Sequence, residues 1–266
     1  MTGTRPAGPI DTSGIVILYE DNHVLVARKP PGILSQSDGG AGADMLTILK
    51  DDLANRYRKP GNVFLGLVHR LDRPVGGLMV FARTSKAAAR LSSQFRERET
   101  EKGYLAVVSV PPAAFEGTLR NRLVRDTGSR TTRVLSGNRE SDPEGNPSEG
   151  MAREAELAYR TLEVVSGSAL VAVRLGTGRG HQIRAQFQAA GYPLLGDRKY
   201  GRPPAGADGG GTRTAFDSLS TVALWAASLA FRHPVRHEWM AFLDPPPDTP
   251  PWSWFSRDIL EQGAIG

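Results

Sequence analysis

The chain has 266 residues, carries a formal net charge of +5 at pH 7 and contains no cysteine. This length is enough to bury a substantial core in one large domain or two small ones, and no apolar run is long enough to span a membrane. The lack of cysteine excludes disulfides and thiolate metal sites, and no secretory signal follows Met1, so we expect a cytoplasmic protein. The basic balance suggests a nucleic acid as partner, although solvated surface arginines would give the same excess.

In the first part of the chain, the sequence pattern predicts both strands and helices. Residues 1–13 are rich in Gly, Pro, Thr and Ser, which is typical of a flexible lead-in. Short apolar runs bounded by turn residues predict strands at 15–19, 24–27, 63–68 and 78–82, of which the third is expected to be buried. Apolar residues at helical spacing predict a helix over about 43–58, and a second helix begins after an N-cap at Thr84 or Ser85.

The second part of the chain consists mostly of predicted strands. These lie at 104–110, 155–165, 169–175 and 238–243, with a hairpin within 118–135, a mixed apolar run at 222–231 and a helix over 181–190. Segments 136–150 and 202–213 are rich in Gly and Pro and predict loops. Many strands with few helices between them favour an α+β fold with a largely antiparallel sheet.

A charged loop joins the strands predicted at 63–68 and 78–82. It carries His69, Arg70, Asp72 and Arg73, followed by a proline and two glycines. Charged side chains at the mouth of a buried strand are costly unless they are paired or used, which makes Asp72 the first candidate for chemistry. The alternative is a turn aspartate that bonds its own backbone.

Other chemistries fit the sequence less well. Gly176, Gly178 and Gly180 precede a predicted helix and suit a phosphate contact, but a dinucleotide site would place the third glycine one position later, although Asp197 stands at a suitable distance. The histidines never fall at metal-binding spacing on a helix, so we expect no metal site. Neither a nucleophile elbow nor a Walker loop is present. A lone aspartate with cationic neighbours remains, and an ionised, partly desolvated carboxylate acts as a nucleophile or a base.

The stretch 69–84, HRLDRPVGGLMVFART, resembles the signature of the RluA-type pseudouridine synthases. Three further stretches agree in the same order: an opening hairpin with ILYED at 17–21 and KPPG at 29–32, the KGY of 102–104, and GRGHQIR at 178–184 followed by Gly196-Asp197 and Tyr200-Gly201. The resemblance spans about 15–256. Two features depart from the family pattern: Val75-Gly76 stands where Thr-Ser is frequent, and residues 1–13 are too few for the N-terminal S4 domain of many members.

The resemblance implies an α+β pseudouridine synthase fold, with a mixed, largely antiparallel sheet, flanking helices and a central active-site cleft. Residues 14–256 would form the catalytic domain, between the lead-in of 1–13 and a C-terminal tail at 257–266. The implied activity is the isomerisation of specific uridines in structured RNA, either rRNA or a tRNA stem-loop. That reaction is redox-neutral and intramolecular, so no cofactor is expected, and a monomer is the default.

The resemblance also assigns roles to residues. Asp72 is the implied catalytic aspartate, acting either at the ribose C1′ or by abstraction of the 2′ proton. Tyr104 stacks on the target base, Arg184 pairs with Asp72, and Arg70 enters the RNA stack when the uridine leaves it. An everted base is required because the glycosidic bond is inaccessible inside a helix, and a planar cation can fill the gap.

Other residues are weighed by their positions alone. Lys29 and Arg179 lie in basic loops and are predicted to meet RNA phosphates. His69, His181 and Gln182 are expected to be structural. Two further functions remain open: a non-catalytic RNA-binding or chaperone protein that retains the fold, for which Val75-Gly76 leaves room, and an N-glycoside hydrolase, which would need a second acid near Asp72.

Overall fold

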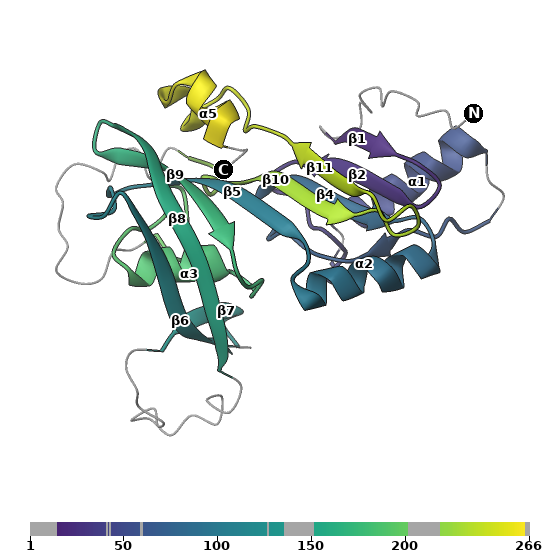
Figure 1. Ribbon diagram of the computed structural model, residues 1–266, viewed down its shortest axis with the longest axis horizontal. Helices are drawn as coiled ribbons and strands as arrows, with labels where there is room; N and C mark the ends of the chain where they lie inside the picture. The colour runs from purple at the N-terminus through teal and green to yellow at the C-terminus, as the bar shows by residue number, and fades with distance from the viewer. Residues whose placement is uncertain are drawn as a thin grey trace. The chain divides into compact units, whose positions relative to one another are not determined.

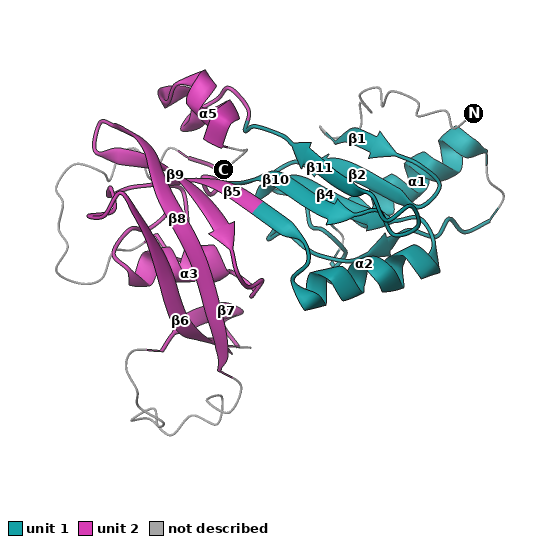
Figure 2. Cartoon of the chain, in the orientation of Figure 1, with its two compact units in different colours: residues 1–102, 225–246, 265 teal, residues 103–224, 247–264, 266 magenta. Residues whose placement is uncertain are grey.

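The structure is a computed structural model that describes residues 15–40, 42, 44–58, 61–126, 128–135, 152–201 and 219–263. The predicted lead-in and the loops predicted at 136–150 and 202–213 lie outside these residues. The chain forms two compact units, one of residues 1–102, 225–246 and 265 and the other of residues 103–224, 247–264 and 266 (Figure 2). The catalytic domain expected over 14–256 therefore draws on both units.

The first unit is a mixed sheet accompanied by two helices (Figure 1). Its strands run in the order β1-β2-β4-β10-β11, with β3 also beside β4, and only the β4–β10 pair is parallel. The elements are β1 (Val16–Glu20), β2 (Val24–Lys29), α1 (Met45–Tyr57), β3 (Gly66–Leu67), β4 (Gly76–Ala82), α2 (Ser85–Glu97), β10 (Leu224–Arg232) and β11 (Trp239–Leu243).

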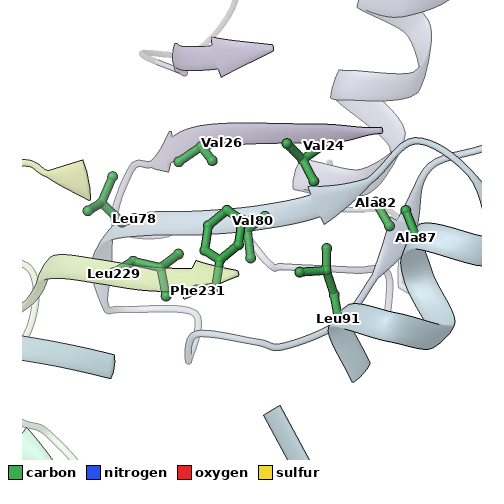
Figure 3. Close-up of a cluster of buried hydrophobic side chains, with 9 residues drawn as sticks. All are labelled: Val24, Val26, Leu78, Val80, Ala82, Ala87, Leu91, Leu229 and Phe231. Carbon is green, nitrogen blue, oxygen red and sulfur yellow. The ribbon is translucent and has the colours of Figure 1, made fainter. Parts of the chain in front are cut away.

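The core of this unit lies between the sheet and α2 (Figure 3). Strand alternation sends every second side chain of β2, β4 and β10 to this face, where they meet the apolar side of α2. The buried cluster consists of Val24, Val26, Leu78, Val80, Ala82, Ala87, Leu91, Leu229 and Phe231. All of β4 is buried, so the strand that follows the Asp72 loop is anchored on both faces.

Both helices of this unit begin at polar caps. The Asp44 carboxylate accepts the Thr47 backbone N–H at 3.1 Å, and the Thr84 hydroxyl accepts the Ala87 backbone N–H at 3.1 Å. Each cap satisfies an N–H that has no partner within its helix. The helices predicted over 43–58 and after Thr84 are confirmed.

The buried strand predicted at 63–68 is wrong in its extent. Only Gly66–Leu67 forms a strand, and the Phe64 side chain is exposed. A β-carbon on Gly66 would lie 3.0 Å from the Ala88 side chain of α2, so the segment passes very close to that helix. Beyond Leu67, the His69 imidazole accepts the Val80 N–H of β4 at 3.0 Å, where a continuing strand would offer a carbonyl.

The second unit is an antiparallel sheet in the order β5-β9-β8-β6-β7. The hairpin predicted within 118–135 is confirmed, as are the strands predicted at 155–165 and 169–175. The elements are β5 (Glu101–Val108), β6 (Glu116–Asp126), β7 (Thr131–Val134), β8 (Arg153–Val165), β9 (Ser168–Leu175), α3 (Gln182–Ala189), the 3-10 turn η2 (Trp252–Trp254) and α5 (Arg257–Gly263).

Two helices complete this unit. Phe187 of α3 meets the Tyr159 ring of β8 at a centroid distance of 5.7 Å, and α3 ends before Gly191, whose φ of 87° lies in the left-handed region. Residues 257–263, expected to belong to the tail, form α5 instead, with Leu260 buried. No helix in the described part of the chain is both long enough and apolar enough to cross a membrane.

Candidate active site

The loop that carries Asp72 is held by the segment that follows β2. Leu71 donates its N–H to the Ser35 hydroxyl at 3.1 Å, and that hydroxyl lies 2.8 Å from the Leu71 carbonyl. The Gly32 N–H donates to the Arg73 carbonyl at 2.8 Å, and the Arg73 guanidinium donates to the Gly32 carbonyl at 2.9 Å. The Asp72 carbonyl accepts the Val75 N–H at 3.0 Å. Asp72, which is half-buried, thus stands on a backbone fixed at both sides.

Lys29 fastens the same loop from within. Its side chain is fully buried, and its ammonium donates to the carbonyls of Pro30, Arg73 and Val75 at 3.0, 3.1 and 2.7 Å. Burial lowers the pKa of Lys29 to about 7, and the charge of Asp72 opposes this shift. These bonds favour an internal role, and an RNA phosphate would have to compete with three carbonyls for the same ammonium.

His69 and Arg70 begin the loop with opposite environments. The His69 ring stacks on Phe95 of α2 at 4.5 Å, and burial lowers its pKa to about 3, so it is neutral near pH 7. The structural role predicted for His69 agrees with these contacts. Arg70, the next residue, is exposed and therefore accessible to RNA.

Trp225 accounts for the glycine in the Val75-Gly76 departure. A β-carbon built on Gly76 would lie 2.2 Å from the Trp225 ring, so no serine fits at this position. A β-carbon on Gly77 would lie 2.3 Å from the Ala226 carbonyl oxygen, because β4 and β10 pair closely here. The indole N–H donates to the Asp244 carbonyl at 2.7 Å, which fixes the ring against β4.

Tyr104 lies on β5 in the second unit. It pairs with Val173 of β9, and its side chain is half-buried while Leu105, the next residue, is fully buried. Its pairing with β9 holds the tyrosine backbone in a fixed register. The base-stacking role of Tyr104 stays a prediction.

The glycine-rich turn before α3 is held by Gln182. The Gln182 amide oxygen accepts the Thr177 hydroxyl at 2.8 Å and the Arg179 N–H at 3.0 Å. Its amide nitrogen donates to the Glu156 carbonyl at 3.0 Å. The structural role predicted for Gln182 agrees with these bonds, and Arg179 is half-buried on the turn. A dinucleotide site would need parallel strands around this turn, whereas β9 pairs antiparallel with both of its neighbours.

Arg184, at the start of α3, is almost fully buried. Its guanidinium bonds to both carboxylate oxygens of Asp197, from Nε at 2.7 Å and from Nη2 at 2.8 Å. The Tyr200 ring lies against the guanidinium, with 4.9 Å between the Arg184 Cζ atom and the ring centroid. The pairing of Arg184 with Asp72 stays a prediction.

Each unit thus gathers part of the predicted site. The first unit brings Lys29 to the Asp72 loop, and the second places Arg179 and Arg184 at the start of α3. The contribution of Asp197 and Tyr200 was missed, although both stand in the 196–201 stretch that carried the resemblance. In the ranges that the structure covers, no group of three or more His, Asp or Glu side chains is placed to hold a metal ion.

Known proteins are similar to this chain in sequence. A family model described as RNA pseudouridylate synthase matches residues 23–189, a range that includes Asp72, Tyr104 and Arg184. The dual-specificity RNA pseudouridine synthase RluA of Salmonella typhimurium is 31% identical over 244 residues, which is 91% of this chain and 98% of that protein. The ribosomal large subunit pseudouridine synthase C of Vibrio parahaemolyticus is 32% identical over 85% of this chain, which spans only 64% of that relative's length.

Solved structures agree in fold. Human RNA pseudouridylate synthase domain containing 1 superposes with a TM-score of 0.68 at 23% identity and covers 97% of both chains. Human RNA pseudouridylate synthase domain containing 4 gives a TM-score of 0.66 at 24% identity, covering 87% of this chain and 88% of the human one. The fold predicted from the resemblance is confirmed by these neighbours. Because the family model matches residues 23–189 and a 31% identical relative is covered over 98% of its length, the chain belongs to the RNA pseudouridylate synthase family.

Proposed function

We propose that the protein is an RNA pseudouridine synthase that isomerises specific uridines in rRNA or tRNA, with Asp72 as its catalytic aspartate. The observation that carries the proposal is the family match over residues 23–189, which contains Asp72, Tyr104 and Arg184 in the order that the resemblance requires. The clamped loop around Asp72 supports it further, because a reacting carboxylate must be held in place before the substrate arrives.

The proposed chemistry takes place on an everted uridine. Asp72 acts on the ribose, the N1–C1′ bond breaks, the uracil turns, and a C5–C1′ bond forms. C5 then loses its proton and N1 gains one, so that the product is an isomer of the substrate. Tyr104 offers a π-face to the uracil, and Arg184 pairs with Asp72. Arg70, which is exposed, replaces the base in the RNA stack, where its planar cation can lie between neighbouring bases. Arg179 meets a phosphate.

The rival reading, a non-catalytic RNA-binding or chaperone protein, rested on Val75-Gly76. The Trp225 ring occupies the space that a side chain at position 76 would need. The glycine is thus explained by packing, and it gives no reason to assume that activity was lost. We therefore propose the catalytic function for a cytoplasmic monomer that needs no cofactor.

The test is nucleoside analysis of unmodified rRNA and tRNA transcripts after incubation with wild-type protein and Asp72→Asn. We expect pseudouridine from the wild type, none from Asp72→Asn, and a similar RNA Kd for both. Asp51→Asn, at an exposed position of α1, is the matched control and should keep full activity. Pseudouridine formed by Asp72→Asn would contradict the assignment; free uracil would indicate a hydrolase, and RNA binding without any product would indicate a binding protein.

A further inference from the structure

We propose that Asp197 is a positioning residue that fixes the Arg184 guanidinium in the orientation needed for pseudouridine formation. This inference rests on the proposed function, in which Arg184 acts on Asp72. Asp197 itself would touch neither the RNA nor the reacting atoms. Its contribution would be made entirely through Arg184.

The contact between the two side chains is bidentate and buried. Both carboxylate oxygens of Asp197 accept from Arg184, at 2.7 and 2.8 Å, and the two side chains are only 0% and 5% exposed. Two parallel hydrogen bonds fix the plane of the guanidinium as well as its position. A buried ion pair contributes little net stability compared with apolar packing, so stability alone does not explain why this pair is used here.

Asp197 is fixed in turn by its own loop. Its Oδ1 also accepts the backbone N–H groups of Lys199 and Tyr200, at 3.0 and 3.1 Å. The preceding Gly196 has a φ of 70°, and a β-carbon there would lie 2.2 Å from the Thr221 carbonyl oxygen. Only glycine fits that conformation and that space. The carboxylate therefore stands on a backbone that has little freedom to move.

Tyr200 completes the arrangement from the other side. Its ring lies against the Arg184 guanidinium, and its hydroxyl accepts the Thr132 N–H of β7 at 2.7 Å. The same hydroxyl lies 2.7 Å from Nδ1 of His181, the residue that precedes α3. Burial raises the pKa of Tyr200, so the hydroxyl keeps its proton near pH 7. The start of α3, the Asp197 loop and β7 are thereby joined around one guanidinium.

These contacts order the Arg184 side chain before the reaction begins, whereas the side chain of a surface arginine would not be ordered. Arginine has a long, flexible side chain, and ordering it during the reaction would oppose catalysis. Asp197 and Tyr200 order it in advance, so that its charge is already aimed when the transition state forms. We expect the loss of this constraint to lower kcat, while RNA affinity, which depends on other cations, stays unchanged.

The test replaces Asp197 by Asn. The amide oxygen can keep the bonds at Oδ1, but the amide N–H₂ then faces the Arg184 Nε–H, so that two donors oppose each other. We expect kcat for pseudouridine formation to fall by about 10- to 100-fold, the cost of misplacing a reacting group by roughly an ångström, with an unchanged RNA Kd. Glu261→Gln, which makes the same chemical change in an exposed ion pair of α5, should match the wild type.

A double-mutant comparison separates positioning from a general structural role. Asp197→Asn is combined with Arg184→Lys, and single-turnover rates are compared with those of Arg184→Lys alone. If Asp197 acts through Arg184, the second substitution adds little to the first. Additive losses, an unchanged kcat in Asp197→Asn, or a loss confined to RNA affinity would each overturn the inference.

If Asp197→Asn does not fold, Tyr200→Leu tests the same inference. This variant removes the ring from the guanidinium but leaves both carboxylate bonds, and we expect kcat to fall by about two- to tenfold with an unchanged Kd. An unchanged kcat would overturn the inference in that case. Failure here is distinct from failure of the proposed function, because in the latter case the wild-type protein itself would form no pseudouridine.

Discussion

At the scale of single residues, Lys29 is a buried cation whose ammonium is bonded to backbone carbonyls. Its ammonium donates to the carbonyl of Pro30, the next residue, and to those of Arg73 and Val75, which follow Asp72. We predict that Lys29→Met lowers the free energy of unfolding by about 2–4 kcal/mol, because buried carbonyls lose their donor. It should also lower the rate of pseudouridine formation, because the Asp72 loop is released. Urea unfolding and a single-turnover assay measure the two effects.

Lys86→Met is the control for this prediction. Lys86 is exposed on α2, so the same chemical change there removes a charge but no internal bond. Its stability and rate should match those of the wild type. If Lys29→Met instead left stability intact and weakened only the affinity for RNA, Lys29 would be a phosphate contact, as its place in a basic loop suggested.

His69 makes a prediction about pH. Burial lowers its folded-state pKa to about 3 from the ordinary value of 6.5, so the native state takes up the proton less readily than the unfolded state does. The stability that this histidine contributes is complete above pH 6.5 and is lost as the pH falls toward 3. Between pH 6.5 and pH 5 the loss should be about 2 kcal/mol.

The variant His69→Gln isolates this contribution. Glutamine can still accept the Val80 N–H but does not titrate, so its stability should fall less steeply with acid than that of the wild type. His237→Gln, at an exposed histidine, should keep the wild-type acid dependence. Urea midpoints measured between pH 7 and pH 5 test this prediction, and an equal dependence on pH for all three proteins would contradict a lowered pKa of His69.

At the scale of elements, the parallel contact between β4 and β10 explains a departure from the family pattern. We predict that Gly76→Ala lowers the free energy of unfolding by about 1–3 kcal/mol or more, because its β-carbon would overlap the Trp225 ring. In the double variant Gly76→Ala/Trp225→Leu the two effects should be far from additive, since the smaller side chain makes room. Thermal and urea unfolding of the single and double variants measure this coupling.

Gly42→Ala provides the comparison for that cycle. A β-carbon at Gly42 meets nothing within 4 Å, so its stability should be close to that of the wild type. Simple addition of the two costs in the double variant would mean that Trp225 does not set the space at Gly76. The glycine would then need another explanation.

The elements were predicted well where a local pattern carried them. Helical spacing located α1, helical spacing with an N-cap at Thr84 or Ser85 located α2, and strand-forming runs bounded by turn residues located the long strands β8 and β9 of the second unit. The strand predicted at 63–68 was too long, because apolar character does not reveal which strand lies beside a segment. Here the His69 side chain takes the Val80 N–H and ends the pairing of β3 with β4. Residues 257–263 were expected to be a tail because seven residues give too little periodicity to identify α5.

At the scale of the whole molecule, the sequence located the candidate residues but not their partners. The types and order of Asp72, Tyr104 and Arg184 could be recognised along the chain. The partnership of Arg184 with Asp197 could not be predicted, because it depends on how the Gly196 turn folds back on α3. The internal role of Lys29 was equally hidden, since a lysine in a basic loop looks the same whether its ammonium faces water or three carbonyls.

The net charge of +5 makes a prediction for RNA binding as a whole. A protein that neutralises phosphates releases counterions, so its RNA affinity should fall linearly with salt concentration on logarithmic axes. Arg179, half-buried on the turn before α3, is the predicted phosphate contact. Arg179→Gln should weaken binding to different RNA sequences alike and reduce the salt slope by about 0.7–1.

The control variant for this test is Arg257→Gln on α5. Arg257 is exposed and bonds to Glu261 of the same helix, so the variant loses the same charge at a place where no RNA contact is proposed. If net charge alone governed affinity, both variants would shift the slope equally. If Arg179 meets a phosphate, only its own variant changes the slope, because counterion release reports cations in contact with the RNA rather than charge elsewhere on the surface. Kd values measured over a range of potassium chloride concentrations distinguish the two.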